Sequence, residues 1–176
     1  MRYGIFFRAI NVGKHNRVRM EDLRSLAEEL GFGEVRTYLQ SGNMALVSDA
    51  TAESVASRVE AALPGLGLKD VAVMVRSRDE LLELGSRADG FVRHSAGEHR
   101  QLAIFTRDPV EAAEPVPYAV KGLTFVAVEG AAVLAAIHRD AAGRVNANAV
   151  VESLWRTRAT TRWWNVVEEF CGECLR

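Results

Sequence analysis

The sequence contains few of the residues that define several classes of protein. Two of its 176 residues are cysteine, which is too few for a framework of disulfide bonds. Its formal net charge is −1, so the chain as a whole has no electrostatic reason to bind nucleic acid or an anionic membrane, although a local basic patch can still exist. No apolar run approaches the roughly 20 residues that span a bilayer, and the N-terminus has no signal-peptide pattern. We therefore expect a cytoplasmic protein with no membrane partner.

The rest of the composition is that of a globular protein. Hydrophobic residues make up 48% of the chain and charged residues 26%, which is enough to bury a core. The length of 176 residues corresponds to one domain or two small ones.

The first half of the chain alternates between predicted strands and predicted helices. Near-continuous apolar runs, or apolar residues at a period of two, predict strands, whereas apolar residues at helical spacing predict helices. The predicted strands cover residues 3–7, 35–39, 44–47 and 71–75, and the predicted helices cover residues 20–30 and 51–63. This β-α-β-β-α-β order is that of a ferredoxin-like fold, an α+β architecture with helices packed on one face of an antiparallel sheet.

The second half predicts a less regular α+β unit. Ser77 and Glu80 resemble a capping box that opens a third helix, and residues 85–100 have the polar, glycine-containing composition of a linker. Further predicted strands cover residues 101–106, 123–128 and 132–138, and further predicted helices cover residues 146–155 and about 161–171. We therefore expect a ferredoxin-like subdomain over residues 1–77, a helix and linker over 78–100, and a second, degenerate ferredoxin-like subdomain over 101–176.

Two polar turns are predicted to meet at one edge of the first sheet. In a ferredoxin-like sheet the spatial strand order is 4-1-3-2, so residues 8–17 and residues 40–43 leave adjacent strands at the same edge. Cationic, amide and hydroxyl groups with two glycines suit a phosphate, a carboxylate or a nucleic-acid backbone. The candidate ligand-binding residues are Arg8, Asn11, Gly13, Lys14, Asn16, Gln40, Ser41, Gly42 and Asn43. The set contains no Asp or Glu, so it offers no obvious magnesium ligand and no general base beyond His15.

Each of these signals also has a purely structural interpretation. Asn and Gly residues shape turns in solvated connections, and a plain hairpin turn explains residues 40–43 equally well. A nucleic-acid partner would require exposed aromatic residues on the sheet face, and Tyr38 is the main candidate.

The two cysteines do not indicate a redox or metal site. Cys171 and Cys174 lie near the end of the predicted last helix, where the helix dipole does not favour a thiolate. Structural zinc needs two further ligands, for which His94 and His99 are candidates in number only. We therefore expect no metal and no cofactor.

Three motifs resemble a known bacterial family. Residues 7–20 (FRAINVGKHNRVRM), 38–43 (YLQSGN) and 160–167 (TTRWWNVV) are similar to the motifs of an uncharacterised family, domain of unknown function 1697. The resemblance implies two ferredoxin-like subdomains in one compact α+β protein. It implies no activity, because the function of the family is not established.

The chain departs from the family pattern within these motifs. Ala9 and Lys14 stand where the family usually has Gly, Trp163 where it has Asn, and Val166 where it has Thr. The two missing glycines make the first loop less able to wrap closely around a phosphate.

The third motif adds one residue to the candidate site. Thr160 or Thr161 resembles a helix N-cap, and a helix N-terminus suits an anion, to which Arg162 would add positive charge. A structural ion pair is the alternative role of Arg162. Trp163 could stack on a base, although a core or interface tryptophan is more common.

Three classes of function are compatible with these residues. The first is a small binding protein with an anion- or phosphate-selective cleft for a nucleotide or a nucleic-acid segment. The second is an enzyme acting on a phosphate-containing substrate, with His15 as acid or base and Arg8 stabilising charge. The third is an interaction module that pairs through open sheet edges, for example with a second copy of the chain.

Overall fold

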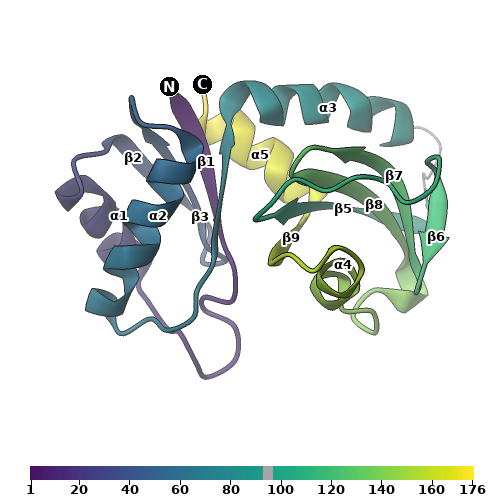
Figure 1. Ribbon diagram of the computed structural model, residues 1–176, viewed down its shortest axis with the longest axis horizontal. Coiled ribbons are helices and arrows are strands. Elements are labelled where there is room, and N and C mark those ends of the chain that lie inside the picture. Colours follow the sequence, from purple (N-terminus) through teal and green to yellow (C-terminus); the bar gives the residue numbers. More distant parts are fainter. Residues whose placement is uncertain (93–96) are drawn as a thin grey trace. The chain divides into compact units, whose positions relative to one another are not determined.

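The computed structural model describes residues 1–92 and 97–176, which contain two antiparallel sheets and five α-helices (Figure 1). The protein is therefore an α+β protein, as the sequence predicted. The chain divides into two compact units. Unit 1 comprises Met1–Leu81 and Phe170–Arg176, and unit 2 comprises Leu82–Glu169. The predicted subdomains differ from these units chiefly because the last residues of the chain return to unit 1.

Unit 1 is built on a four-stranded sheet in the order β2-β3-β1-β4. Its elements are β1 (Arg2–Phe7), α1 (Met20–Glu29), β2 (Gly33–Tyr38), β3 (Asn43–Val47), α2 (Ala52–Ala62), the short 3₁₀ helix η1 (Leu63–Leu66) and β4 (Val73–Ser77). β1 pairs antiparallel with both neighbours, so that Ile5 lies between Met44 and Val75. This is the strand order and the succession of elements predicted from the sequence.

The two faces of this sheet are covered by different parts of the chain. On one face Tyr3, Ile5 and Phe7 pack against apolar residues of α1 and α2 such as Leu23 and Val55. Alternate side chains of a strand point to opposite faces, so Gly4 and Phe6 belong to the other face. The Phe6 ring lies 5.6 Å from that of Phe170, whose C-terminal segment belongs to the same unit. The sequence did not predict this second layer.

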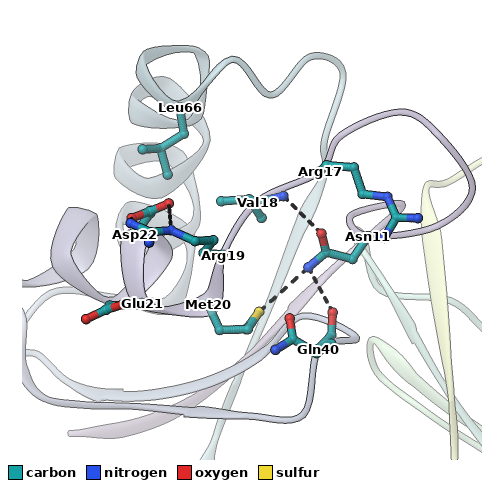
Figure 2. Close-up of a pocket in the computed structure, with 9 residues that line it drawn as sticks. All are labelled: Asn11, Arg17, Val18, Arg19, Met20, Glu21, Asp22, Gln40 and Leu66. Carbon is teal, nitrogen blue, oxygen red and sulfur yellow. Dashed lines mark hydrogen bonds and ion pairs between the residues drawn. The ribbon is translucent and has the colours of Figure 1, made fainter.

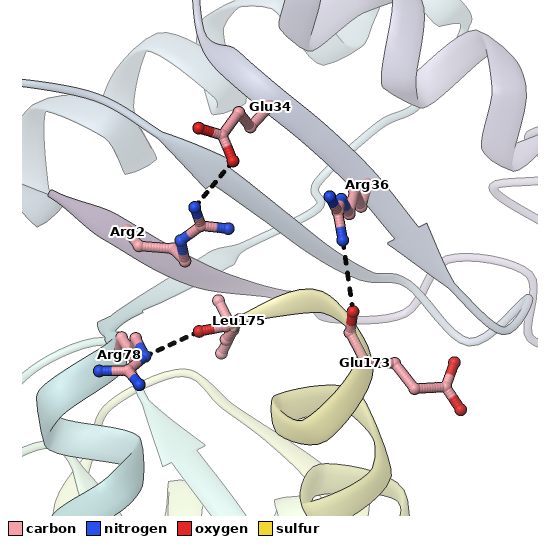
Figure 3. Close-up of polar contacts among 6 residues, drawn as sticks. All are labelled: Arg2, Glu34, Arg36, Arg78, Glu173 and Leu175. Atoms are coloured by element: carbon pink, nitrogen blue, oxygen red, sulfur yellow. Dashed lines mark hydrogen bonds and ion pairs between the residues drawn. The ribbon is translucent and has the colours of Figure 1, made fainter.

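The C-terminal segment Phe170–Arg176 is held to unit 1 by packing and by polar contacts (Figure 3). An added Cβ at Gly4 would lie 2.8 Å from Leu81 Cδ1 and 3.0 Å from Phe170 Cε1, so only glycine fits there without rearrangement. Arg78 Nε donates to the carbonyl oxygen of Leu175 at 2.8 Å. Arg36 likewise donates to the Glu173 carbonyl oxygen at 3.4 Å.

Unit 2 has a five-stranded sheet in the order β6-β7-β8-β5-β9. Its elements are most of α3 (Arg78–Val92), β5 (His99–Thr106), β6 (Tyr118–Val120), β7 (Leu123–Glu129), β8 (Ala132–His138), η2 (Arg139–Ala141), α4 (Ala147–Trp155), β9 (Ala159–Trp163) and the first part of α5 (Trp164–Cys174). The strands β7-β8-β5-β9 repeat the spatial order of the first sheet, with β5 in the place of β1. No α-helix connects β5 to β7, a stretch that the structure describes in full.

The second half differs from the sequence-based expectations at three places. Residues 85–92 are helical, because α3 continues through Gly85 to Val92, and β5 begins at His99. The short strand β6 was not predicted. The last helix begins at Trp164 rather than near Thr161, because Thr161 pairs with Ile104 in a sheet ladder. Thr160 and Thr161 resemble helix-capping residues in the sequence, but their hydrogen bonding with β5 places them in a strand.

Left-handed backbone conformations shape the loop between β1 and α1. Ala9, Asn11, Gly13 and Asn16 have φ angles of 62°, 53°, 64° and 50°. Glycine and asparagine tolerate this region, whereas alanine meets a steric conflict between its Cβ and the backbone. Ala9 therefore carries a steric cost that glycine at the same position would not carry.

Replacing Ala9 with glycine is therefore expected to stabilise the protein. The steric cost of alanine in a left-handed conformation is larger than the stability lost when glycine gives the unfolded chain more conformational freedom. Ala9→Gly should therefore raise the free energy of unfolding by roughly 0.5–1 kcal/mol. Chemical denaturation monitored by circular dichroism measures this change. The exposed α2 residue Ala61 is the control, because Ala61→Gly removes a good helix former and should lower stability. A loss of stability in Ala9→Gly would contradict the explanation.

The predicted capping box at the start of α3 is confirmed and yields a second prediction. Glu80 N–H donates to Ser77 Oγ at 3.2 Å, and Glu80 Oε2 accepts from Ser77 N at 2.7 Å. Ser77→Ala should lower the free energy of unfolding by about 1 kcal/mol, because it removes an N-cap acceptor. Ser86→Ala within the same helix should be close to neutral, since the exposed Ser86 hydroxyl only donates to the Glu83 carbonyl oxygen. Equal effects of the two changes in urea denaturation would argue against a special role for the cap.

Candidate functional site

The loop after β1 and the hairpin turn between β2 and β3 meet at one edge of the unit 1 sheet. We call residues 8–19 the basic loop and residues 39–42 the hairpin turn. Phe7 N–H donates to the Gly42 carbonyl oxygen at 3.0 Å, and Asn11 Nδ2 donates to the Gln40 carbonyl oxygen at 3.0 Å. The meeting of these two segments was predicted from the strand order alone, and β1 does lie beside β3.

Asn11 joins three segments through its side chain (Figure 2). Besides the bond to the hairpin turn, its Oδ1 accepts from the Val18 N–H at 2.9 Å, and its Nδ2 lies 3.9 Å from Met20 Sδ. Asn11 N–H also donates to the Asn16 carbonyl oxygen at 2.9 Å. The amide is therefore engaged in building the site, and its hydrogen-bonding groups already have partners.

Asn16 fixes the far side of the basic loop. Its Nδ2 donates to the Lys69 carbonyl oxygen, and its Oδ1 accepts from the Lys69 N–H, each at 3.0 Å. This two-way contact anchors the loop to the segment before β4. Asn16 thus acts as a structural residue.

The hairpin turn is shaped by Gly42 and Asn43. Gly42 has a φ angle of 78°, and an added Cβ would lie 2.7 Å from two side-chain carbons of Ile10. Asn43 is fully buried, and its Nδ2 donates to the Tyr38 carbonyl oxygen at 3.1 Å and to Ser41 Oγ at 3.0 Å. These residues hold the turn against the basic loop.

A pocket of about 750 Å³ opens where the basic loop, the hairpin turn and the start of α1 come together (Figure 2). It is lined by Asn11, Arg17, Val18, Arg19, Met20, Glu21, Asp22, Gln40 and Leu66. Among the sequence-predicted residues, Asn11 and Gln40 line it. Seven others lie in the basic loop, the hairpin turn or the start of β3 without lining it, namely Arg8, Gly13, Lys14, Asn16, Ser41, Gly42 and Asn43.

The pocket contains acidic residues that sequence reasoning did not include. Glu21 and Asp22 lie in the first turn of α1, where negative charge suits the helix dipole. The basic loop runs directly into α1, so these first-turn residues reach the same edge. That continuity of loop and helix was the feature of the sequence that could have predicted acidic residues at this site.

Two of the four charged lining residues neutralise each other. Arg19 Nε and one terminal nitrogen bind the two Asp22 carboxylate oxygens at 3.0 and 2.7 Å. This contact lowers the pKa of the Asp22 carboxyl, chiefly through the hydrogen bond from Arg19. Arg17 and Glu21 form no ion pair or side-chain hydrogen bond with the residues that the structure describes. The hydrogen bond with Asp22, and then the charges of Asp22 and Glu21, raise the pKa of Arg19, so Glu21 also acts on that guanidinium. Arg17 is therefore the lining charge without a charged partner among the described residues.

The tip of the basic loop is exposed. Val12 is 70% exposed, and Lys14 and His15 are exposed without a hydrogen bond or ion pair to any described residue. His15 does not line the pocket. The side chain proposed as an acid or base in the enzyme alternative is thus outside the pocket.

Arg162 belongs to unit 2, where it lies in β9 and is 9% exposed. One of its terminal nitrogens donates to Thr160 Oγ1 at 2.8 Å and to the Thr161 carbonyl oxygen at 2.9 Å. Burial lowers the pKa of its guanidinium to about 10, which leaves it charged at neutral pH. Neither Thr160 nor Thr161 is the predicted N-cap, because both are strand residues.

The aromatic residues considered for stacking on a base are engaged within the protein. The Arg100 guanidinium lies 3.5 Å from the centroid of the Trp163 ring, an arrangement typical of a cation–π contact. The Tyr38 ring lies 6.1 Å from that of Phe170, which covers this face of the unit 1 sheet. The sheet face therefore offers no open aromatic platform among the described residues of unit 1.

The described residues contain no group of three or more metal-ligating side chains. His99 faces His138 across two strands, with ring centroids 5.4 Å apart, and His94 lies outside the described residues. Cys171 and Cys174 form no disulfide bond, and burial raises the pKa of Cys174. None of the described helices is long and apolar enough to cross a membrane.

Comparisons with known proteins place the chain in a family without assigning it an activity. No curated protein matches the sequence. The structure is similar to that of the conserved bacterial protein SP0830 from Streptococcus pneumoniae, with a TM-score of 0.69 and 17% identity over 99% of this chain and 98% of the other. At this identity the likeness concerns the fold. Residues 1–132, which include the basic loop and the hairpin turn, match the family model described as "Protein of unknown function (DUF1697)", and the chain belongs to this family.

Proposed function

We propose that this protein binds a small phosphate-containing molecule in the pocket between the basic loop and the hairpin turn. The observation that carries the proposal is the unpaired guanidinium of Arg17 on the wall of a cavity of about 750 Å³. Cavities of roughly 300–1,000 Å³ are typical of sites for small molecules and cofactors.

The charge of the basic loop supports an anionic ligand. It contains four cationic residues, Arg8, Lys14, Arg17 and Arg19, and no acidic residue, although the whole chain has a formal net charge of −1. With Glu21 and Asp22 of α1 counted against these four cations, this edge keeps a formal charge of +2, which would attract an anionic ligand. A guanidinium also matches the geometry of phosphate oxygens, with which it forms paired, charge-assisted hydrogen bonds.

The coverage of the sheet supports a small molecule over a nucleic-acid segment. Modules that read single-stranded RNA on a four-stranded sheet stack bases on exposed aromatic residues. In unit 1 the corresponding rings, Phe6 and Tyr38, contact Phe170 of the C-terminal segment. Binding at the edge of the sheet needs no such platform.

The arrangement supports binding more than catalysis. Asn11 and Asn16 are occupied in holding the loop, and His15 lies outside the pocket. Gln40 is exposed and its side-chain amide has no partner among the described residues, so it can accept or donate to a ligand. These contacts support recognition of a ligand by the pocket.

Removing the Arg17 guanidinium tests the proposal. A hydrogen bond to a charged group contributes on the order of 1.5–3 kcal/mol, so Arg17→Ala should weaken binding of nucleoside monophosphates roughly tenfold or more. Calorimetric titration with a panel of the common ribonucleoside monophosphates measures the affinity.

The control is Arg24→Ala, which removes an exposed α1 guanidinium that does not line the pocket and is 3.7 Å from Glu28. Its affinity should stay that of the unsubstituted protein. Equal affinities in the Arg17 and Arg24 variants, or no binding of any phosphate monoester by the unsubstituted protein, would refute the proposal.

A further inference from the structure

We propose that His99 and His138 together bind one divalent transition-metal ion that prefers imidazole ligands, such as Zn²⁺, with water as the remaining ligands. Both residues belong to unit 2, so this site is independent of the phosphate-binding pocket proposed in unit 1. Three features of the pair support it, namely the register of the two strands, the spacing of the rings and the contacts of the ring nitrogens.

The two histidines face each other at one end of the β5–β8 ladder. His99 is the first residue of β5 and pairs with His138, the last residue of β8. The next pair outward is hydrogen-bonded, because Arg139 N–H donates to the Glu98 carbonyl oxygen at 2.9 Å. Hydrogen-bonded and non-hydrogen-bonded pairs alternate along an antiparallel ladder. His99 and His138 are therefore a non-hydrogen-bonded pair, the kind whose side chains lie closer together.

The spacing of the two rings matches that of two imidazoles on one metal ion. Their centroids are 5.4 Å apart, and their planes are inclined at 87°. A zinc ion lies about 2.0–2.1 Å from the nitrogen that binds it, and hence roughly 3.2 Å from the ring centroid. At a tetrahedral angle, two such rings have centroids roughly 5 Å apart, whatever the rotation of each ring about its metal–nitrogen bond. The strands therefore already hold the rings at the separation that a shared ion requires.

The contacts of His138 favour its Nε2 atom as the ligand. Asp140 N–H donates to His138 Nδ1 at 3.3 Å, and Asp140 Oδ2 lies 3.7 Å from the same nitrogen. Because Nδ1 accepts this bond, the neutral ring carries its proton on Nε2. Metal binding at Nε2 would move that proton to Nδ1, where a carboxylate commonly accepts the hydrogen bond of a metal-binding histidine. Asp140 is placed to do so.

Both rings are accessible to an ion from solvent. The His138 side chain is 49% exposed, and His99 is partly exposed. His99 forms no hydrogen bond or ion pair with any described residue, so its ring nitrogens are available. The described residues supply no third protein ligand, which leaves the other coordination positions to water. Imidazole ligands suit zinc, copper and nickel, whereas magnesium prefers oxygen.

The test follows the ring C–H signals of the histidines by nuclear magnetic resonance while zinc chloride is added to the full-length protein. In the unsubstituted protein the His99 and His138 signals should shift together, with one dissociation constant. His99→Ala and His138→Ala should each weaken zinc binding at the remaining ring roughly tenfold or more, because the second imidazole no longer binds within the same molecule. Magnesium chloride should shift neither signal.

His15→Ala is the matched control, because His15 is an exposed imidazole of the basic loop without a hydrogen bond or ion pair to any described residue. This change should leave the zinc affinity of the His99–His138 pair unaltered. The titration of the unsubstituted protein needs no variant, so the proposal stays testable even where a substitution impairs folding.

Three results would overturn the proposal. They are a zinc response at only one of the two rings, an unchanged affinity at one ring after the other is removed, and the absence of saturable shifts at both rings up to millimolar zinc. None of these results bears on phosphate binding at Arg17, which the nucleotide titrations test separately.

Discussion

The candidate site depends on the side-chain amide of Asn11. This one group is hydrogen-bonded to the hairpin turn at Gln40 and to the last part of the basic loop at Val18. Each bond contributes on the order of 1 kcal/mol, but their joint effect is to hold two separate turns and the start of α1 at a common edge. The left-handed backbone at Asn11 aims the amide, and the adjacency of β1 and β3 brings the turns within its reach.

The construction of unit 1 explains why the candidate site lies at an edge. One face of the sheet is covered by α1 and α2, and Phe170 of the C-terminal segment packs on the other. The close approach at Gly4 shows how tightly that segment packs on β1. With both faces occupied in this way, the connections at the end of β1 and between β2 and β3 offer unpaired polar groups to a ligand. Within the described part of unit 1, the pocket at this edge brings together Arg17, Glu21 and Gln40.

The sequence predicted the frame of unit 1 better than the roles of individual side chains. The alternation of strands and helices gave the strand order, and the strand order correctly placed Asn11 beside the hairpin turn. Sequence patterns reveal that Asn16 and Asn43 have donors and acceptors, but not that Lys69 and Tyr38 supply their partners. The Asn16 contact joins residues whose proximity depends on the completed fold, whereas the Asn43 contact depends on the geometry of the hairpin.

The errors in the second half have a common physical origin. Thr161 and Arg162 are strand residues because they pair with β5, and that pairing partner is more than fifty residues away in the chain. Gly85 looked like the start of a linker, yet α3 continues through it, with the Trp164 ring 3.9 Å from where a Cβ would be. Long-range packing overrides local preference in both cases. The omission of Glu21 from the predicted site had a different cause, since Glu21 belongs to the helix that follows the basic loop and the predicted site ended with the loop.

Nuclear magnetic resonance tests most directly the claim that this edge of the sheet is the binding surface. Backbone amide signals are followed while inorganic phosphate and then each of the common ribonucleoside monophosphates are added to the isotope-labelled protein. The account predicts saturable shifts concentrated in residues 9–22 and 38–42, with little change elsewhere. Shifts concentrated in another part of the chain, or none at either titration, would contradict it.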